Sequence, residues 1–182
     1  LCELLTRAYR SNQYRGRAEL KRAWLAAPAS DGMIALSGAH HGDVGMALCA
    51  GNHKQAQELA RQWAENFPRR YYLELQRMQL NSAAGSQIEN CVQQSLQLAS
   101  GLKLPVVATH PVQFLRADDF RAHEARVCIA EGYMLSDQRR PRRFGPDQYF
   151  TTQAEMERLF ADVPQALANS IGIAMRCNLA LE

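Results

Sequence analysis

The sequence has no apolar run long enough to cross a bilayer and no recognisable signal peptide. Its cysteines are odd in number and widely separated, so they indicate neither a zinc site nor a disulfide framework. Most stand among apolar neighbours, as reduced buried thiols do; they are Cys2, Cys49, Cys91, Cys128 and Cys177. We therefore expect a cytoplasmic protein without membrane contact, in which Cys128 is a core residue and not a reactive nucleophile.

A phosphate-cradling loop is also lacking, because Gly38 and Gly42 are not followed by the Lys and Ser or Thr of that motif. The net charge of +3 is modest and says little about partners. Nucleotide binding by this chain is therefore not supported.

The apolar content suffices for one core, since 47% of the 182 residues are hydrophobic. Short apolar runs at 33–36, 71–75 and 105–108 predict buried strands. They alternate with helical patterns at 54–66 and 86–101, the second opening with a possible capping box from Ser86 to Glu89. This alternation predicts an α/β protein with a largely parallel sheet or barrel. The expected buried helical positions are Leu59, Trp63, Phe67, Ile88, Val92, Leu96 and Ala99.

The pattern changes after Ile129, because strand signals stop and residues 136–148 are polar, basic and interrupted by two prolines and a glycine. Two helices are expected to follow, begun by Thr152 and by Asp162, with Pro164 in the first turn of the second. The second helix is expected to bury Val163, Leu167, Ile171 and Ala174. We place a soft boundary near Ser136, dividing the chain into residues 1–135 and 136–182.

Candidate ligands stand at the expected strand ends, where α/β folds place their chemistry. His110 follows the third strand, and His40 and His41 follow the first. Glu74 lies in an apolar strand, where an ionised carboxylate is costly unless a metal, an Arg or backbone amides hold it. For His40 and His41 a solvated position before a helix competes with a metal role. His123 is expected to form a buried hydrogen bond.

Residues 108–113, Ala-Thr-His-Pro-Val-Gln, resemble the last metal-site motif of the PHP (polymerase and histidinol phosphatase) domain of bacterial DNA polymerase III alpha subunits. That motif usually reads Ala-Thr-Asn-Asp-Val-His-Tyr. Its Asp falls on Pro111 and its His on Gln113, while His110 replaces its Asn. A further family ligand, the His of Glu-x-Gln-x-His, falls on Met78 after Glu74. Groups that bind hard cations poorly thus stand at three ligand positions.

The resemblance covers essentially the whole chain in order. It includes Leu36-Ser-Gly38 with Gly42-Asp43-Val44, Tyr71-Tyr-Leu-Glu-Leu75, Arg140-Pro-Arg142, Gln148-Tyr149, Glu155-Met156, Leu159-Phe160, Ala166-Leu-Ala-Asn169 and Arg176-Cys-Asn178. It implies a portion of a distorted βα barrel of the PHP type, followed by a helical connection toward the polymerase palm. By the same resemblance, the first PHP motifs lie upstream of this chain and the palm lies downstream.

The resemblance further implies a fragment of a replicative DNA-directed DNA polymerase whose PHP domain is a degenerate scaffold. No catalytic residue, metal ligand or cofactor is then expected in this chain, where Glu74, Met78, His110, Pro111 and Gln113 are vestigial positions. Magnesium would serve the parent polymerase. The implied partners are the proofreading exonuclease subunit, other replicase subunits and, through the parent chain, DNA. The alternative is an active metal-dependent phosphoesterase or 3′-5′ exonuclease that uses Glu74, His110 and His40 or His41.

Arginine gathers in two places. The first cluster holds Arg10, Arg15, Arg17, Lys21 and Arg22 near Tyr9, Tyr14 and Trp24, and the second holds Arg139, Arg140, Arg142 and Arg143 beside Phe144. Arginine beside aromatic rings can bind phosphates and stack on bases. A solvated surface is the favoured interpretation of the first cluster, whereas the second is an equal candidate for DNA contact. A stand-alone helical nucleic-acid-binding module would explain both clusters but not the strands.

Overall fold

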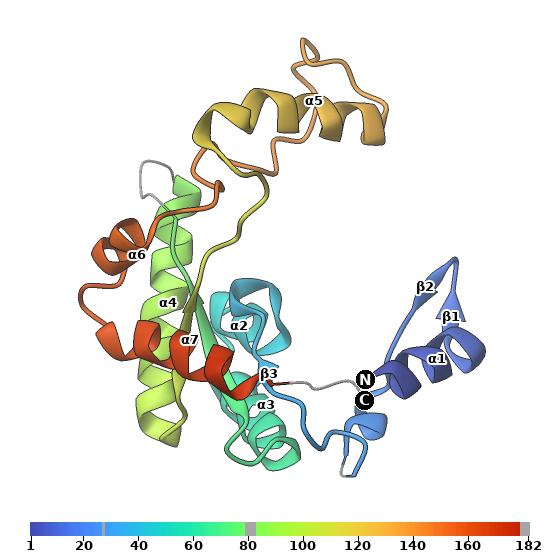
Figure 1. The fold of residues 1–182 in the computed structure, drawn as a ribbon, viewed down its shortest axis with the longest axis vertical. Helices are drawn as coiled ribbons and strands as arrows, with labels where there is room; N and C mark the ends of the chain where they lie inside the picture. Colours follow the sequence, from blue (N-terminus) through green and yellow to red (C-terminus); the bar gives the residue numbers. More distant parts are fainter. Residues whose placement is uncertain (27, 79–82, 179–182) are drawn as a thin grey trace.

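The computed structural model describes the chain except for residues 27, 79–82 and 179–182. One sheet is parallel, with strand order β3-β4-β5. Its strands are β3 (Ala35–Leu36), β4 (Tyr71–Gln76) and β5 (Val106–Thr109). All three lie within two residues of their predicted positions, which confirms the α/β class and the parallel sheet (Figure 1). Within the described residues the sheet is open and does not close into a barrel.

Three helices pack around β4 to form the main core. They are α2 (Asp43–Cys49), α3 (His53–Asn66) and α4 (Ala83–Leu102). Their small and apolar side chains interlock with the strand, because burying these faces removes apolar surface from water. The buried members are Val44, Ala47, Leu48, Ala56, Ala60, Phe67, Tyr71, Leu73 and Ala99, with Leu59 and Trp63 partly buried beside them.

Helix α4 begins at Ala83, three residues before the predicted start. Ser86 therefore lies inside the helix, and the predicted capping box at Ser86 is wrong, since Ala83 and Ala84, which favour helix, precede it. The predicted apolar stripe is confirmed, with Val92 and Ala99 buried and Ile88 and Leu96 partly so.

Helices α6 (Gln153–Leu159) and α7 (Pro164–Arg176) cover β5. The Asn169 amide donates to the Val106 carbonyl at 2.7 Å, and the Ser170 hydroxyl donates to the Ala108 carbonyl at 2.7 Å. These carbonyls point away from β4, so α7 occupies the outer hydrogen-bonding groups of an edge strand. The sheet ends at β5 because α7 takes the place of a further strand there.

The inner face of α7 agrees in part with the predicted one, because Val163 and Leu167 are partly buried against the core as expected. Ala166 is fully buried and Ser170 faces β5, whereas Ile171 and Ala174 are exposed. The polar contacts to β5 rotate the helix, a feature that apolar periodicity does not record. The expected N-cap at Thr152 is confirmed, because its hydroxyl accepts from the Glu155 amide while Glu155 accepts from the Thr152 amide.

Two segments project from this body. One joins α1 (Cys2–Ser11) to the hairpin β1 (Gln13–Tyr14) and β2 (Arg17–Ala18), followed by the short helix η1 (Arg22–Leu25). The other contains η3 (Ala117–Asp119) and α5 (Phe120–Glu131) and extends from the opposite side of the sheet (Figure 1). Every helix in the described part of the chain is too short or too polar to span a bilayer.

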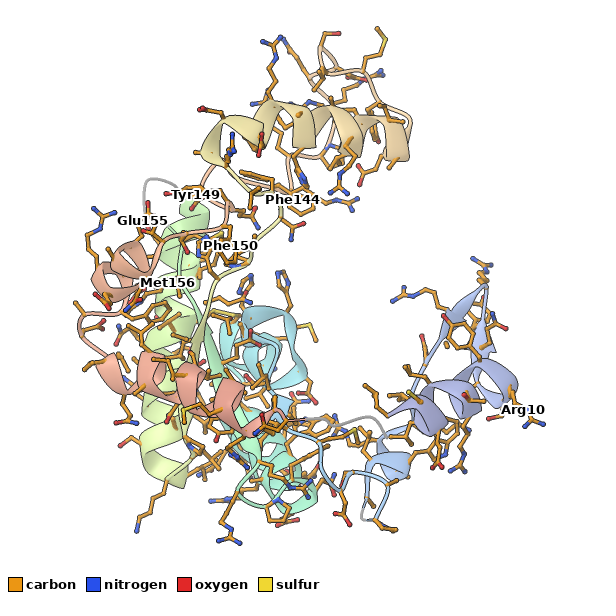
Figure 2. The ribbon with its side chains drawn as sticks, viewed as in Figure 1. Arg10, Phe144, Tyr149, Phe150, Glu155 and Met156 are labelled. Carbon is orange, nitrogen blue, oxygen red and sulfur yellow. A yellow bond between two sulfur atoms is a disulfide. The ribbon has the colours of Figure 1, made fainter. Side chains whose placement is uncertain are left out.

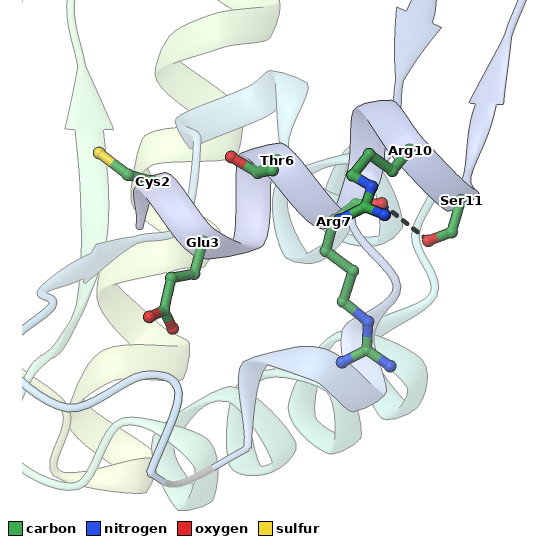
Figure 3. Close-up of a pocket in the computed structure, with 6 residues that line it drawn as sticks. All are labelled: Cys2, Glu3, Thr6, Arg7, Arg10 and Ser11. Carbon is green, nitrogen blue, oxygen red and sulfur yellow. Dashed lines mark hydrogen bonds between the residues drawn. The ribbon is translucent and has the colours of Figure 1, made fainter.

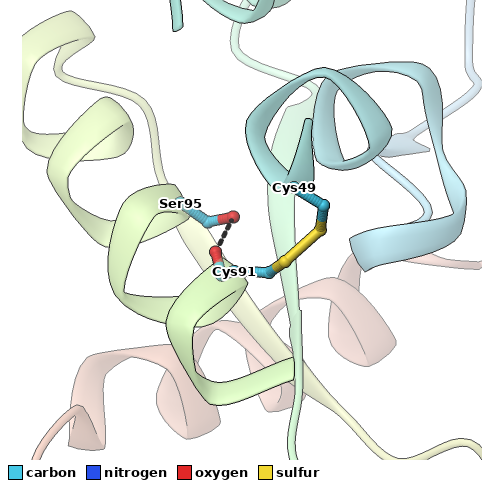
Figure 4. Close-up of a disulfide and its surroundings, with 3 residues drawn as sticks. All are labelled: Cys49, Cys91 and Ser95. Carbon is cyan, nitrogen blue, oxygen red and sulfur yellow. Dashed lines mark hydrogen bonds between the residues drawn. A yellow bond between two sulfur atoms is a disulfide. The ribbon is translucent and has the colours of Figure 1, made fainter. Parts of the chain in front are cut away.

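The expectation that all five cysteines are reduced is wrong for two of them. A disulfide joins Cys49 at the end of α2 to Cys91 in α4, across 42 positions of sequence (Figure 4). Cys128 is buried and free, as expected, but Cys2 and Cys177 are free and exposed. Wide spacing concealed the pair, because the packing of α2 against α4, and not the sequence, brings the two residues together.

Arg77 follows β4 and forms the main polar contact of the interior. Its guanidinium pairs with Glu89 of α4 through two hydrogen bonds of 2.8 and 2.9 Å. It also pairs with Asp162 and donates to the Leu159 carbonyl at 2.8 Å. The side chain is only 9% exposed and lies over the Phe160 ring. One charge thus joins β4, α4 and the α6–α7 connection.

Replacing Arg77 with Met should therefore destabilise the chain by about 1.5–3 kcal/mol, because Glu89, Asp162 and the Leu159 carbonyl lose hydrogen bonds from a charged group. Urea unfolding monitored by circular dichroism measures the loss. The matched control is Arg139→Met. The Arg139 side chain is 89% exposed beside Asp137, so its replacement should lower the free energy of unfolding by less than about 1 kcal/mol. Equal effects of the two substitutions would contradict this role of Arg77.

Candidate functional site

Glu74 points its carboxylate toward donors of the protein itself. One oxygen accepts from the Gly38 amide at 3.1 Å. The other accepts from the Thr109 hydroxyl at 2.6 Å and from the Gln76 side-chain amide at 3.2 Å. The sequence left either an Arg or backbone amides as the partner of Glu74 in the absence of a metal. The Gly38 backbone amide is one of the observed partners, and the Thr109 hydroxyl and the Gln76 side-chain amide are the others. These bonds satisfy the carboxylate without a metal ion.

The loop after β3 brings the Gly38 amide to Glu74. Gly38 has φ 77°, and η2 (Ala39–His41) begins with Ala39 at φ 47°, both in the left-handed region. Gly45 of α2 lies directly on this loop, since a Cβ at that position would stand 1.8 Å from the Ala39 carbonyl oxygen. The close approach of two backbones thus sets the position of the loop.

His40 and His41 lie next to each other, with ring centroids 3.9 Å apart. Burial, followed by the neighbouring His41, lowers the pKa of His40, so its ring is neutral near pH 7. Its Nδ1 atom is buried without a hydrogen-bond partner. His40 and Glu74 share a cavity of about 10 Å³, which offers space for about one water molecule.

His110 is held by main-chain carbonyls. Its Nδ1 lies 3.2 Å from the Arg77 carbonyl oxygen, and its Nε2 lies 2.8 Å from the Asp147 carbonyl oxygen. A neutral imidazole donates from only one of its nitrogens, but a carbonyl oxygen stands within hydrogen-bonding distance of each nitrogen here and occupies the position that a metal ion would need. His110 therefore connects β4 and β5 to the segment around Asp147.

The other positions that align with family ligands surround this connection. Met78 is half buried two residues beyond the end of β4. The Pro111 carbonyl accepts from the Gln148 side chain at 3.2 Å, and the Gln113 amide donates to the Gln148 carbonyl at 2.8 Å. The Gln113 side chain is exposed. The loop that resembles a metal-site motif therefore contacts the later part of the chain.

Gln148 is the central residue of the contact between the 110–114 loop and the later part of the chain, and the sequence analysis did not identify it. Its side chain also accepts from the Gly145 amide at 2.8 Å, and it is 8% exposed. A bridge pairs Phe114 with Tyr149, and the Phe150 amide donates to the Phe114 carbonyl at 3.0 Å. We call these contacts between residues 110–114 and 145–150 the latch. Its only sequence signal was an ordered match of Gln148-Tyr149 to the family.

The latch leads directly into α6. The Tyr149 hydroxyl donates to Glu155 at 2.6 Å, and this bond, with the Thr152 cap, lowers the pKa of Glu155 to about 2. In Figure 2, Phe144, Tyr149 and Phe150 mark the course of the chain from the α5 segment toward Glu155 and Met156. The connection is thus held by hydrogen bonds at both of its ends.

The second arginine cluster is mostly paired with acids. Arg140 donates to Glu124 of α5 at 2.6 Å with a side chain only 9% exposed, and this bond raises the pKa of Arg140. Arg139 pairs with Asp137, and Arg143 pairs with Glu131. Arg142 forms no ion pair with the described residues. Three of the four candidate DNA contacts thus hold the loop against its own segment.

His123 lies buried in the same segment. Its ring stands edge-on to Phe144 and accepts from Arg126 at 3.2 Å, so the expected buried hydrogen bond is confirmed. Burial, followed by the charge of Arg126, lowers its pKa.

The first cluster follows α1 and the hairpin. Arg7 lies over the Trp24 ring, Arg15 over Tyr14, and Arg22 over Trp63 while pairing with Asp43. Arg7 and Arg10 share an open face of α1 with Glu3 and Thr6 (Figure 3). The cluster is therefore a solvated surface in which stacking on aromatic rings holds several cations.

Across the described residues, no three His, Cys, Asp or Glu side chains come close enough together to hold a metal ion. The structure brings Glu74 and His40 to one cavity but draws His110 away to the latch. Among the described residues, the arrangement supplies hydrogen bonds that join separate segments of the chain.

Gly45→Ala tests the close approach under the Glu74 loop. The new Cβ must displace the Ala39 carbonyl, so we expect a loss of about 1–3 kcal/mol or more in the free energy of unfolding. Gly172→Ala in α7 is the matched control, because nothing lies within 4 Å of its Cβ position. It should stabilise by about 0.5–1 kcal/mol through helix propensity. If Gly45→Ala left the free energy of unfolding unchanged, the close approach of Gly45 to the Ala39 carbonyl would be refuted.

Gln148→Ala tests the latch. It removes two buried side-chain hydrogen bonds, for which we expect a cost of about 1–3 kcal/mol. Hydrogen exchange of the Gln113 and Phe150 amides should accelerate, because both amides are bonded across the latch. The control Gln153→Ala removes only an exposed bond to Glu157. Unchanged exchange in the Gln148 variant would show that the side chain does not hold the latch.

Comparison with known proteins agrees with this geometry. Residues 1–78 match the PHP domain family. The chain is 49% identical over 180 residues to DNA polymerase III subunit alpha of Neisseria meningitidis serogroup A, covering 98% of this chain and 15% of that protein. The corresponding subunit of Pseudomonas aeruginosa is 42% identical over 183 residues, a match that covers 100% of this chain and 15% of that protein. The subunit of Escherichia coli strain K12 is 40% identical over 178 residues, a match that covers 98% of this chain and 15% of that protein.

The chain thus spans only a small part of the relatives that it matches, yet it aligns with them along nearly its whole length. Its first 78 residues match the PHP domain, and over nearly its whole length it is similar to DNA polymerase III alpha subunits.

Proposed function

We propose that this chain is a scaffold segment of a DNA-directed DNA polymerase, in which structural contacts have replaced a PHP metal site. The observation that carries the proposal is the placement of His110, whose two ring nitrogens face the carbonyl oxygens of Arg77 and Asp147. A residue at a ligand-bearing loop thereby joins two parts of the chain.

Glu74 supports the same conclusion. Both of its oxygens accept hydrogen bonds from the protein, and its neighbours at the family's ligand positions are Met78, Pro111 and Gln113. A thioether, a pyrrolidine ring and an uncharged amide do not provide the charge that binds a hard divalent cation tightly. A metal ion here would have to break the Glu74 bonds and find ligands outside the chain.

The activity of the whole protein is then template-directed DNA synthesis, because its relatives are named DNA polymerase III subunit alpha. Magnesium ions would act at palm aspartates outside this chain, by stabilising the attacking and leaving oxygens. The working partners would be DNA, the other replicase subunits and the proofreading exonuclease, which this segment would help to dock in the cytoplasm. A separate exonuclease would make a nuclease site in the PHP domain dispensable.

The latch gives this scaffold a physical means of bracing the polymerase. We infer that residues 1–135 complete a distorted PHP-type barrel with preceding strands, and that residues 136–182 lead toward the palm. Contacts at Gln148, His110 and Arg77 couple the two parts. Arg142, which lacks an acidic partner among the described residues, is the member of its cluster best suited to a DNA phosphate.

One observation favours the alternative, an active phosphoesterase or 3′-5′ exonuclease. His40 has an unpartnered ring nitrogen and shares the small cavity with Glu74. Two groups on one side of a cavity are fewer than the three protein ligands of a catalytic site, so further ligands from other parts of the polymerase would be required.

Metal analysis and phosphodiesterase assays of the full-length alpha subunit, with manganese and with zinc, distinguish the two functions. The variant is Glu74→Gln, and the control is the exposed Glu65→Gln on α3. We expect equal metal content and equal oligonucleotide cleavage in the wild type and both variants. Loss of one bound metal ion and of cleavage in Glu74→Gln alone, with an unchanged circular dichroism spectrum, would overturn the scaffold proposal.

A further inference from the structure

The disulfide between α2 and α4 joins one exposed cysteine to one buried cysteine. Cys49 is exposed at the end of α2, whereas Cys91 is 8% exposed within α4. Their Cα atoms are 5.6 Å apart, a separation that suits a disulfide without movement of the helices. Figure 4 shows the bond crossing between the two helices beside Ser95.

A pocket of about 540 Å³ adjoins this bond. Its lining contains both cysteines together with His40, Gln87, Ile88 and Asn90. The volume falls in the range of pockets that hold small molecules, and the amide and imidazole groups can hydrogen-bond to a peptide. An accessible disulfide thus lies in the wall of a polar pocket large enough for a small ligand.

We propose that Cys49 and Cys91 form a thiol–disulfide exchange site that accepts a small peptide thiol, of the tripeptide class, in this pocket. In the oxidising direction the Cys49 thiolate attacks one sulfur of the small disulfide and forms a mixed disulfide. One small thiolate leaves and takes up the proton that Cys49 released.

The Cys91 thiolate then attacks the Cys49 sulfur and closes the Cys49–Cys91 bond. The second small thiolate leaves and takes up the proton from Cys91. Two protein thiols are oxidised and one small disulfide is reduced to two thiols, so electrons and protons balance. Cys49 reacts first because it is exposed, and Cys91 resolves the intermediate because the fold holds it beside Cys49.

The state of this bond changes how α2 is held. Helix α2 packs on the loop that presents the Gly38 amide to Glu74, and α4 carries Glu89, which pairs with Arg77. The disulfide ties these two helices covalently, and reduction leaves noncovalent packing alone. Opening of α2 should therefore be easier in the reduced protein.

The test uses the full-length alpha subunit, glutathione disulfide as oxidant and dithiothreitol as reductant. Alkylation followed by peptide mass spectrometry should find Cys49 linked to Cys91 after oxidation and both residues alkylated after reduction. Hydrogen exchange of the α2 amides should be at least about tenfold faster in the reduced protein. This comparison needs no substitution, so it stands even if a variant fails to fold.

Variants then separate the two roles. Cys91→Ser should trap glutathione on Cys49, whereas Cys49→Ser should leave Cys91 modified at least about tenfold more slowly because Cys91 is buried. The control Cys177→Ser removes an exposed free cysteine and should leave the Cys49–Cys91 link unchanged. A wild-type protein that keeps glutathione on Cys49, or that keeps both thiols free after oxidation, would overturn the proposal.

Discussion

The buried Arg77 guanidinium is the interaction on which the arrangement of the later helices depends. It stands directly after β4 and bonds to Glu89 of α4, to the last residue of α6 and to Asp162 between α6 and α7. A cation with so little exposure is stable only while its carboxylate and carbonyl partners remain in place. Hydrogen bonding from Arg77 accordingly lowers the pKa of Asp162, which keeps that partner ionised. The covering of β5 by α7 follows from this anchor.

The strand ends of an α/β sheet normally collect functional groups, and here they collect contacts within the chain. Glu74 accepts from Gly38 and Thr109, and His110 reaches the segment around Asp147. The side chains of Met78, Pro111 and Gln113 carry no charge that would attract a cation to this edge of the sheet. The loop at residues 110–114 contacts Gln148 instead, so this end of the sheet joins β5 to the segment around residues 145–150.

Much of the secondary structure was predictable because its signals are local. The apolar runs of β4 and β5, the buried stripe of α4 and the Thr152 cap each depend on residues within a few positions of one another. The α7 face was predicted correctly at Val163 and Leu167 and incorrectly at Ile171 and Ala174, because Asn169 and Ser170 bond to β5, which no helical periodicity encodes. The start of α4 was predicted too late because Ser86 fits a cap and a helix interior equally well by sequence.

The sequence by itself determined the α/β class and the similarity to the PHP domain and to DNA polymerase III alpha subunits, since these depend on local patterns and on residue identity. Only the tertiary structure decided which groups meet. Arg77 and Asp162 are 85 positions apart, His110 and the Asp147 carbonyl 37, and Cys49 and Cys91 42. Contacts at such separations arise from the packing of helices on the sheet, and the pairing of side chains becomes definite only when that packing is complete.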